Sequence, residues 1–514
     1  MASKTYKWDD WSGGEYGILR PEEQKKNQFS GSNMLLYDNG FVGPRSGLKY
    51  TSGIGGGALA AHGREAIGYA DVDQAEWVLY ADTYVYSWTD FAWLQSVSVG
   101  TSVAKPGLFV RTATDTNYLV TPGNGLDIVL HVASSVPTIT PVTIAVFATI
   151  GSAASLYRDR MYISDDTTTA RVRYSAANDY TSWVADNYFD VGDNTPIAWM
   201  GWSGSRLIII KENMETWAYQ GVPGRDTLVR LNEAQIPGGL QGRCVTTTKN
   251  GDIWAWVPGK AYPHKLVGSR FVGLRHLTPF PDGGGHRGSW VDVVGSMSGT
   301  HEDDGVMGVI RSGDAKSADE DRWVIAIRRN SAWSFHDLVG QFLGVAIVVA
   351  QSDSADRALI ITGSSAINGF QFNHFNNLET ETDDPYGELG DYSGTISVEC
   401  TFDTSTYIVS SPKETRVHKV IVELDSLSIP TGSSSQARLS AVDVVGLAAD
   451  GEEHTLDFGT WTHAISARAG GYRAVFTSDG DMPMTQFRVH LECRGVSIKT
   501  IAVVMEEDDE NTRG

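Results

Sequence analysis

The sequence predicts an all-β protein: a β-propeller with an N-terminal extension before it and a C-terminal β-sandwich-like domain after it. The composition supports this fold class, because the chain has 15 Trp, 20 Tyr and 55 Gly among its 514 residues. Aromatic residues favour strands, and Gly favours the tight turns that join short strands. No stretch of about 12 residues or more shows the apolar period of an amphipathic helix. The length exceeds one hydrophobic core, and a prior of about 150 residues per domain gives roughly three units.

Residues 1–60 form the predicted N-terminal extension, a platform-like element. Pro21 begins the one early stretch that resembles a helix start, because Pro is tolerated in the first helical turn. Asp38-Asn39-Gly40 lies between apolar residues and predicts a hairpin turn. Gly53–Gly57 predicts a flexible joint to the next region.

Residues 61–380 show a loose period of roughly 40 to 50 residues, which indicates a repeat architecture. In the repeat that contains Arg160–Ser164 and Arg171–Ser175, strands rich in β-branched and aromatic residues are separated by short polar turns. A repeat of four short strands is typical of propeller blades, so we expect about six or seven blades. Stacked β-sandwiches are the alternative.

The acidic segment Glu379–Pro385 marks the end of the predicted propeller. The predicted C-terminal domain, residues 386–505, contains enough alternating strands for a β-sandwich. The strands expected in it are Thr395–Phe402, Arg416–Leu424, Ala437–Leu447, Tyr472–Phe476, Gln486–Cys493 and Val496–Met505. Residues 506–514 are expected to be an acidic tail.

The charge balance restricts the function classes. The chain has 62 acidic and 41 basic side chains, a net charge of −21, which disfavours stable binding to a phosphate backbone. DNA that only slides past such a surface is compatible with this charge. Met1–Trp8 lack the apolar core of a signal peptide, and no apolar run is long enough to span a membrane. We therefore expect synthesis in the cytoplasm and no membrane-spanning segment.

The search for catalytic and ligand-binding motifs predicts no catalytic residue, no cofactor and no metal. Cys244, Cys400 and Cys493 are widely spaced, so buried free thiols are expected rather than a disulfide framework or a zinc site. A glycoside hydrolase would need two facing carboxylates. Ser175–Trp183 approaches the Asp box of sialidase-type propellers but lacks its Gly.

Loop residues leave two further alternatives. His264, His276, His286 and His301 fall in segments rich in Gly, Pro and Asp, and we interpret them as surface or intersubunit residues. The acidic segments at 301–305 and 312–321 offer clustered oxygens for calcium, although the 12-residue calcium-loop pattern is absent. Solvated acidic loops are the simpler interpretation.

Three segments carry a family resemblance. Asn33–Tyr50 has the order Asn, turn, Arg45-Ser46-Gly47. Leu156–Gly221 contains Asp190-Val191-Gly192 between a Trp-bearing strand and a second one that ends in Gly, and Phe487–Ile501 supplies two closing strands. Together they resemble the tail-tube, or nozzle, proteins of short-tailed bacteriophages (podoviruses). Where the family has Arg-Pro-Gly, this chain has Ser46 in place of the Pro.

The resemblance implies a structural virion protein rather than an enzyme. Copies of it would close a ring, a homohexamer in the family, that docks to the portal and the head-to-tail adaptor. Tail fibres or tailspikes would attach outside, and the genome would be ejected through the channel without specific DNA binding. Localisation in the virion tail follows from the same resemblance.

The residues singled out for this role are structural. Arg45 and Gly47 are expected to fix the N-terminal element against a blade, with an exposed loop as the alternative. Asp303, Asp304, Asp383 and Asp384 are candidates for the channel wall or the fibre interface. Two other functions remain open: a host-surface glycan-binding tail protein that uses exposed Trp and Tyr, and a propeller glycoside hydrolase.

Overall fold

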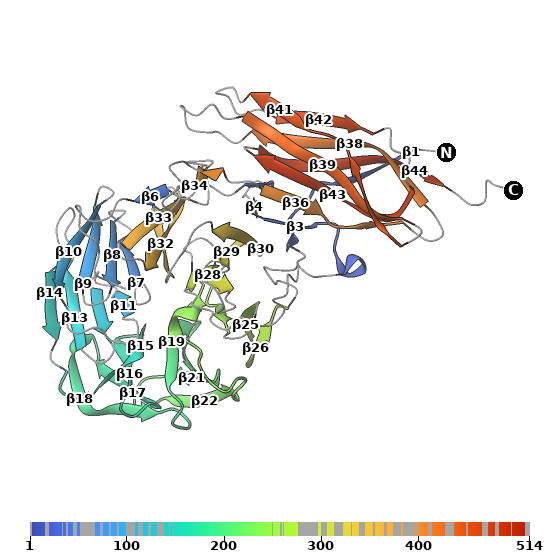
Figure 1. The fold of residues 1–514 in the computed structure, drawn as a ribbon. Helices are drawn as coiled ribbons and strands as arrows, with labels where there is room; N and C mark the ends of the chain where they lie inside the picture. Colours follow the sequence, from blue (N-terminus) through green and yellow to red (C-terminus); the bar gives the residue numbers. More distant parts are fainter. Residues whose placement is uncertain are drawn as a thin grey trace.

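The computed structural model consists of a β-propeller beside a β-sandwich (Figure 1). It describes residues 3–15, 20–32, 34–36, 40–44 and 49–51, the strands between 67 and 142, most of 144–275, the strands between 297 and 397, and most of 400–508. Within this part of the chain no helix is long and apolar enough to cross a membrane. The described residues include two 3-10 turns, η1 (Pro21–Glu23) at the predicted helix start and η3 (Gly242–Cys244).

Among the described residues, seven four-stranded antiparallel sheets form the blades. Blade 1 contains β7 (Ile67–Asp71), β8 (Glu76–Ala81), β9 (Tyr84–Thr89) and β10 (Ala92–Ser98); blade 2 contains β11 (Leu108–Arg111), β12 (Asn117–Thr121), β13 (Gly125–Leu130) and β14 (Thr138–Val142). Blade 3 contains β15 (Ile150–Tyr157), β16 (Arg160–Asp165), β17 (Arg171–Ala176) and β18 (Asp179–Asp190); blade 4 contains β19 (Ile197–Ser203), β20 (Arg206–Lys211), β21 (Thr216–Gln220) and β22 (Thr227–Asn232).

Blades 5 to 7 complete the ring. Blade 5 contains β23 (Val245–Thr247), β24 (Ile253–Trp256), β25 (Pro263–Val267) and β26 (Arg270–Gly273); blade 6 contains β27 (Met297–Gly299), β28 (Val306–Ser312), β29 (Arg322–Arg329) and β30 (Ala332–Leu338). Blade 7 contains β31 (Val345–Ser352), β32 (Ala355–Gly363), β33 (Ile367–Asn373) and β6 (Lys49–Thr51). The first strand of each blade contacts the first strand of the next, and β31 contacts β7. The propeller is therefore closed, and the predicted fold class and blade number are confirmed.

The closing strand comes from the other end of the propeller sequence. β6 pairs antiparallel with β33, with Tyr50 opposite Phe370. Residues 49–51 therefore complete the last blade, which ties the beginning of the propeller region to its end. β6 is the outer strand of blade 7, so the pairing covers the edge of β33.

The propeller core lies between neighbouring blades rather than inside one sheet. One cluster combines Tyr162 of blade 3 with Leu207 and Tyr219 of blade 4. A second combines Ile210 of blade 4 with Trp254 of blade 5 and Trp333 of blade 6. A blade cannot bury its faces alone, so each depends on the blades beside it.

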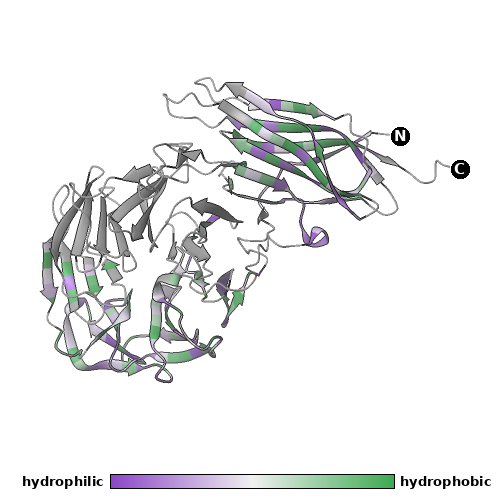
Figure 2. Ribbon diagram, viewed as in Figure 1, coloured by the Kyte–Doolittle hydropathy of each residue, from purple (hydrophilic) through white to green (hydrophobic). Residues whose placement is uncertain are grey.

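The sandwich contains two layers that share one core. Layer A runs in the order β2 (Gly14–Glu15), β3 (Gln28–Ser32), β36 (Cys400–Thr404) with β37 (Tyr407–Ile408), β43 (Pro483–Arg494), β39 (Gln436–Ala448), and then β40 (Glu453–Asp457) with β41 (Trp461–Ala464). Layer B runs in the order β42 (Gly471–Thr477), β38 (Glu414–Ser426), β44 (Val496–Asp508), then β1 (Ser3–Trp8) with β5 (Val42–Pro44), and β4 (Met34–Leu36). Hydrophobic and hydrophilic residues alternate along these strands (Figure 2), as a sheet with one buried face requires.

The predicted N-terminal extension is divided between the two units. β1 pairs with β44, and Trp8 lies fully buried in the sandwich core with its indole N–H donating to Ser405 Oγ at 3.1 Å. β4 and β5 pair antiparallel around the predicted hairpin turn. Residues 3–44 therefore belong to the sandwich and residues 49–51 to the propeller, so the extension of 1–60 is not a separate unit.

The C-terminal boundaries also differ from the expected ones. β44 continues to Asp508, so the segment expected as an acidic tail from residue 506 begins inside a strand. Between the two units, β34 (Thr382–Asp383) pairs with β35 (Ile396–Ser397). The propeller contacts the sandwich through β30, which lies against β2, β3 and β4. This contact places the propeller at one lateral edge of the sandwich.

Candidate functional site

Most of the site residues expected from the sequence fall outside the described residues. Arg45, Gly47, Asp303, Asp304 and Asp384 lie outside them, and so do the acidic segments at 301–305 and 313–321. Asp383 lies on β34, where its backbone pairs with Ile396. These residues remain predictions. The described residues point instead to the junction of blades 3 and 4 and to the outer faces of the sandwich.

Lys211 forms a buried ionic contact at the junction of blades 3 and 4. Its side chain is completely buried at the end of β20. Its Nζ donates to the backbone oxygen of Asp193 at 2.8 Å and to its carboxylate at 2.7 Å, and Glu215 Oε2 lies 3.3 Å away. The Asp193 segment leads from β18 into β19. The ammonium group therefore joins the segment between the blades to a hairpin of blade 4.

The sequence around Gly192 is adapted to this contact. Gly192 has a φ of +61°, and a Cβ there would lie 3.0 Å from Lys211 Nζ and 3.0 Å from the Trp217 ring. The hydrogen bond from Lys211 lowers the pKa of Asp193 to about 2. Asp193 therefore stays ionised, which suits a permanent ion pair and not proton transfer. We refer to Gly192, Asp193, Lys211, Glu215 and Trp217 as the blade lock.

The blade lock explains a pattern that the sequence showed only as a resemblance. The resemblance included Asp190-Val191-Gly192, but no ionic role was assigned to this segment. A Lys that follows four apolar residues in β20 was the available signal, since a buried Lys requires a paired carboxylate.

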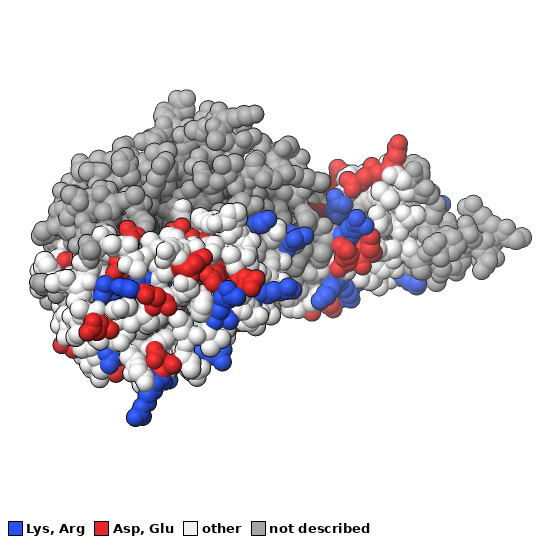
Figure 3. Space-filling view, turned by 90° about the horizontal axis from the view of Figure 1, so that it is seen from below, with Lys and Arg blue, Asp and Glu red and all other residues white. Residues whose placement is uncertain are grey.

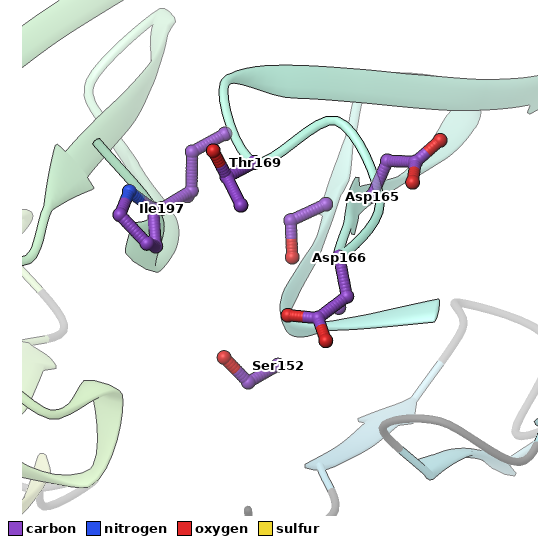
Figure 4. A pocket seen from close by; sticks show the side chains of 8 residues that line it. Ser152, Asp165, Asp166, Thr169 and Ile197 are labelled. Carbon is purple, nitrogen blue, oxygen red and sulfur yellow. The ribbon is translucent and has the colours of Figure 1, made fainter. Parts of the chain in front are cut away.

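A shallow pocket opens beside this junction (Figure 4). Its cavity volume is about 10 Å³, which is about the space that one water molecule needs. It is lined by Gly151, Ser152, Ser164, Asp165, Asp166, Thr169, Pro196 and Ile197. Asp165 is buried and accepts hydrogen bonds from Arg173 Nε at 2.9 Å and from the backbone N–H groups of Thr167 and Thr168.

The pocket residues do not form an acid–base pair. Asp165 accepts hydrogen bonds from a guanidinium and two backbone amides, so its carboxyl group is already engaged by structural partners. Asp166 and Ser152 point toward the pocket in Figure 4, whereas the Asp165 carboxylate points away. Asp127, whose pKa burial raises to about 6, lies in another blade on β13. Asp127 therefore does not line this pocket.

The segment that resembles an Asp box is a hairpin turn. Ala176 pairs with Asp179 across the β17–β18 turn, and Asn178 occupies the left-handed region with a φ of 56°. Trp183 donates its indole N–H to the backbone oxygen of Tyr180 at 3.0 Å. These contacts assign the segment a local structural role.

The remaining chemistry-bearing residues have structural positions. Cys244, Cys400 and Cys493 are buried and form no disulfide, as predicted. His264 was expected at the surface, and this expectation is wrong. It is buried in β25, stacked on Tyr262, and burial lowers its pKa to about 4. No group of three metal-ligating side chains occurs in the part of the chain that the structure describes.

Charged residues cross the outer face of layer A in a row. Asp403, His490, Asp443 and Asp457 are register partners on β36, β43, β39 and β40. His490 Nδ1 lies 3.1 Å from Asp403 Oδ1, and this contact raises the pKa of His490. Arg488 Nε donates to the same carboxylate at 3.3 Å. Burial and the neighbouring Asp457 raise the pKa of Asp443.

Comparisons with known proteins do not assign the chain to a family. No family model and no curated protein matches it. Virginiamycin B lyase from Staphylococcus aureus is 8% identical, with a TM-score of 0.40 over 67% of this chain and 99% of that one. BBS1N in complex with ARL6DN is 9% identical, with a TM-score of 0.40 over 64% and 97%. PorZ of Porphyromonas gingivalis is 12% identical, with a TM-score of 0.38 over 78% and 46%.

These similarities assign no function. The identities and TM-scores are too low to transfer a residue role, although virginiamycin B lyase is itself an enzyme by name. A functional argument for this chain therefore depends on its own residues.

Proposed function

We propose that this chain is a structural virion protein, the nozzle subunit of a short-tailed bacteriophage tail. Copies form a homohexameric ring below the portal and the head-to-tail adaptor, and the genome leaves through its channel. Tail fibres or tailspikes attach to the outside. In this role the chain is not an enzyme, binds no cofactor, and resides in the virion after synthesis in the host cytoplasm.

One observation carries the proposal: the buried charges of the described residues join structural elements to one another. Lys211 connects the segment between two blades to blade 4. Asp165 forms an ion pair with Arg173 and accepts hydrogen bonds from a turn within blade 3. Neither contact presents a reactive group to a cavity of substrate size. A protein that must stay rigid while DNA passes needs such contacts and no catalytic centre.

The charge and the connectivity agree with this role. A net charge of −21 disfavours adhesion to DNA in a channel. β1 lies in the sandwich and β6 closes the propeller, so one N-terminal segment joins the two units. The segments that resemble nozzle proteins include the blade lock residues Gly192, Lys211 and Trp217.

A host-surface glycan-binding protein is the second candidate. The observation that favours it is Trp202, at the end of β19, whose side chain is 47% exposed. Exposed aromatic rings stack on sugar faces. A propeller glycoside hydrolase is the third candidate, and Asp127, with its raised pKa, is the residue that it would use.

Light scattering and negative-stain imaging of the purified protein test the proposal. We expect rings with a central hole, either alone or after addition of the portal–adaptor assembly. A protein that stays monomeric and does not bind that assembly would contradict the nozzle function. Retention on a glycan array that Trp202→Ala abolishes would support the second candidate, and release of sugar from the array would support the third.

A further inference from the structure

The sandwich presents two opposite outer faces that differ in charge. Inward residues of both layers, such as Val489 and Val503, form the common core. The residues that alternate with them point outward, because successive side chains of a strand lie on opposite faces. We call the two surfaces face A, on layer A, and face B, on layer B.

Face A is predominantly acidic among the side chains that the structure describes. Its acidic residues are Asp403, Asp443, Glu453, Asp457 and Glu492, and they accompany the basic residue Arg488 and the titratable His490. Arg488 contacts both Asp403 and Glu453, so its charge is already shared. Glu453 and Glu492 project from the face with exposed side chains.

Face B carries more basic than acidic side chains in the described part of its strands. Its basic residues are Lys7, Arg416, Lys419, Arg473 and Lys499, and its acidic residues are Glu423, Asp425 and Glu506. Glu506 contacts His418 at 3.5 Å. Val475, on the same face, is 48% exposed. The face therefore combines a basic excess with an exposed apolar side chain at the edge strand β42.

The contacts of β30 with the sandwich lie at one lateral edge of the two layers rather than on face A or face B. β30 contacts β2, β3 and β4, which lie at the same lateral edge of the two layers. Trp461 of β41 contacts Tyr472 of β42 at a centroid distance of 5.9 Å, which places these strands together at the other edge. The view in Figure 3 shows acidic and basic side chains close together on the sandwich, next to the propeller.

We propose that face A of one copy binds face B of the next copy, and that this contact builds the ring. The inference depends on the nozzle function proposed above. Two different, complementary surfaces on opposite sides of one domain make a head-to-tail contact, which closes into a ring when the rotation between copies permits it. Charge complementarity selects the occupant of face A, because the second copy offers the basic surface that face A lacks.

Charge reversal on each face tests this contact. Variant A is Glu453→Lys with Glu492→Lys, and variant B is Lys419→Glu with Arg473→Glu. Each should weaken self-association by at least about tenfold, because variant A removes the acidic excess of face A and variant B makes face B acidic like face A. The matched control is Lys265→Glu, on the propeller. Circular dichroism establishes that each variant is folded, and light scattering at low and high salt measures association.

A mixture of the two variants gives the sharper result. Variant A keeps an intact face B and variant B keeps an intact face A, and the two reversed faces are also complementary to each other. An equal mixture should therefore assemble into rings in which the two variants alternate, although neither variant assembles alone. Combining all four reversals in one chain should restore the ring, because the lysines introduced on face A can then pair with the glutamates introduced on face B. Restoration would show that the faces meet each other rather than a third surface.

Each outcome distinguishes the inference from the proposed function. Rings of the wild-type protein that neither variant disturbs would overturn the contact and leave the nozzle function standing. Rings that one variant alone abolishes would also overturn it, since both faces are required. A wild-type protein that stays monomeric with the portal–adaptor assembly, and at low salt, would overturn both.

Discussion

The propeller and the sandwich differ in how their hydrophobic cores are organised. The propeller core is divided into clusters shared by neighbouring blades, such as the one around Tyr162 and Tyr219. The sandwich has a single core that combines Trp8 and Trp11, from the beginning of the chain, with strands near its end. Tyr162 and Tyr219 belong to consecutive blades of the propeller. In the sandwich, by contrast, the hydrogen-bonded residues Trp8 and Ser405 are 397 residues apart.

This difference predicts how damage spreads. A defect between two blades should affect those blades, because each blade depends on its neighbours. A defect at Trp8 should affect strands from both ends of the chain, because they bury the same core. Four predictions test this comparison, and amide hydrogen exchange read by mass spectrometry locates the effect of the first three.

Trp8→Ala should have the largest effect. Trp8 is fully buried, packs edge-on against Tyr6 at a centroid distance of 4.7 Å, and donates a hydrogen bond to Ser405. Its removal should lower the free energy of unfolding of the sandwich by about 4 kcal/mol. Exchange should rise in peptides from both 3–44 and 400–508 and stay unchanged in blades 3 and 4.

The exposed Trp202 provides the matched control for this substitution. Trp202→Ala should change stability by less than about 0.5 kcal/mol. If Trp8→Ala increased exchange only in peptides near residue 8, the idea of a single sandwich core would be wrong.

Lys211→Met should come next, with a loss of about 3 kcal/mol confined to blades 3 and 4. Removal of the ammonium group leaves Glu215, which is 6% exposed, with the half-exposed Arg230 at 3.6 Å as its remaining cationic contact. Lys265→Met is the control, because the Lys265–Asp252 pair is partly exposed and contributes little. Equal effects of the two substitutions would show that the blade lock adds nothing beyond a surface ion pair.

Gly192→Ala should cost about 2 kcal/mol, because the positive φ and the close approach to Lys211 both oppose a Cβ. Gly224→Ala is the matched control, since Gly224 has a φ of +83° with open space around its Cβ position. The difference between the two isolates the contact from the backbone strain. A Gly192→Ala protein no less stable than Gly224→Ala would mean that the blade lock tolerates a side chain there.

The sequence predicted local features better than distant ones. Repeated short strands and the turn at Asp38–Gly40 are local patterns, and both the propeller and the antiparallel pairing of β4 with β5 agree with them. Two other features, the completion of blade 7 by β6 and the pairing of β1 with β44, join residues that are hundreds of positions apart. No local sequence pattern indicates such pairing, so the sequence predicted that residues 1–60 form one separate extension.

The candidate sites show the same limit. His264 read as a loop residue because Gly and Pro surround it, yet it is buried in β25, since neighbours from other strands decide burial. Lys211 carried a usable signal in the apolar run before it. No sequence pattern identified Asp193 as the partner of Lys211, because an acidic residue in a turn is ordinarily solvated. The opposite charges of faces A and B required the strand order of the sandwich and could not be read from the sequence.

The smallest effect concerns the pH dependence of the sandwich. The contact with Asp403 raises the pKa of His490 above its usual value, and Asp443 and Glu492 act in the same direction, whereas burial opposes them. A raised folded pKa means that the stabilisation is fully present below the unfolded pKa of about 6.5. It is lost as the pH rises through the higher folded value. The contribution should be about 1 kcal/mol or less, because the pair is partly exposed.

His490→Asn isolates this contribution from the titration of other groups. Urea midpoints of the wild-type and variant proteins, measured from about pH 6 to about pH 9, should differ most at the acidic end and converge as His490 loses its proton. The propeller is unchanged in both proteins, so it cancels in the difference. A difference that stayed constant with pH would mean that His490 stabilises layer A by packing alone. A difference that grew toward alkaline pH would show that the neutral imidazole is the form that the acidic row binds.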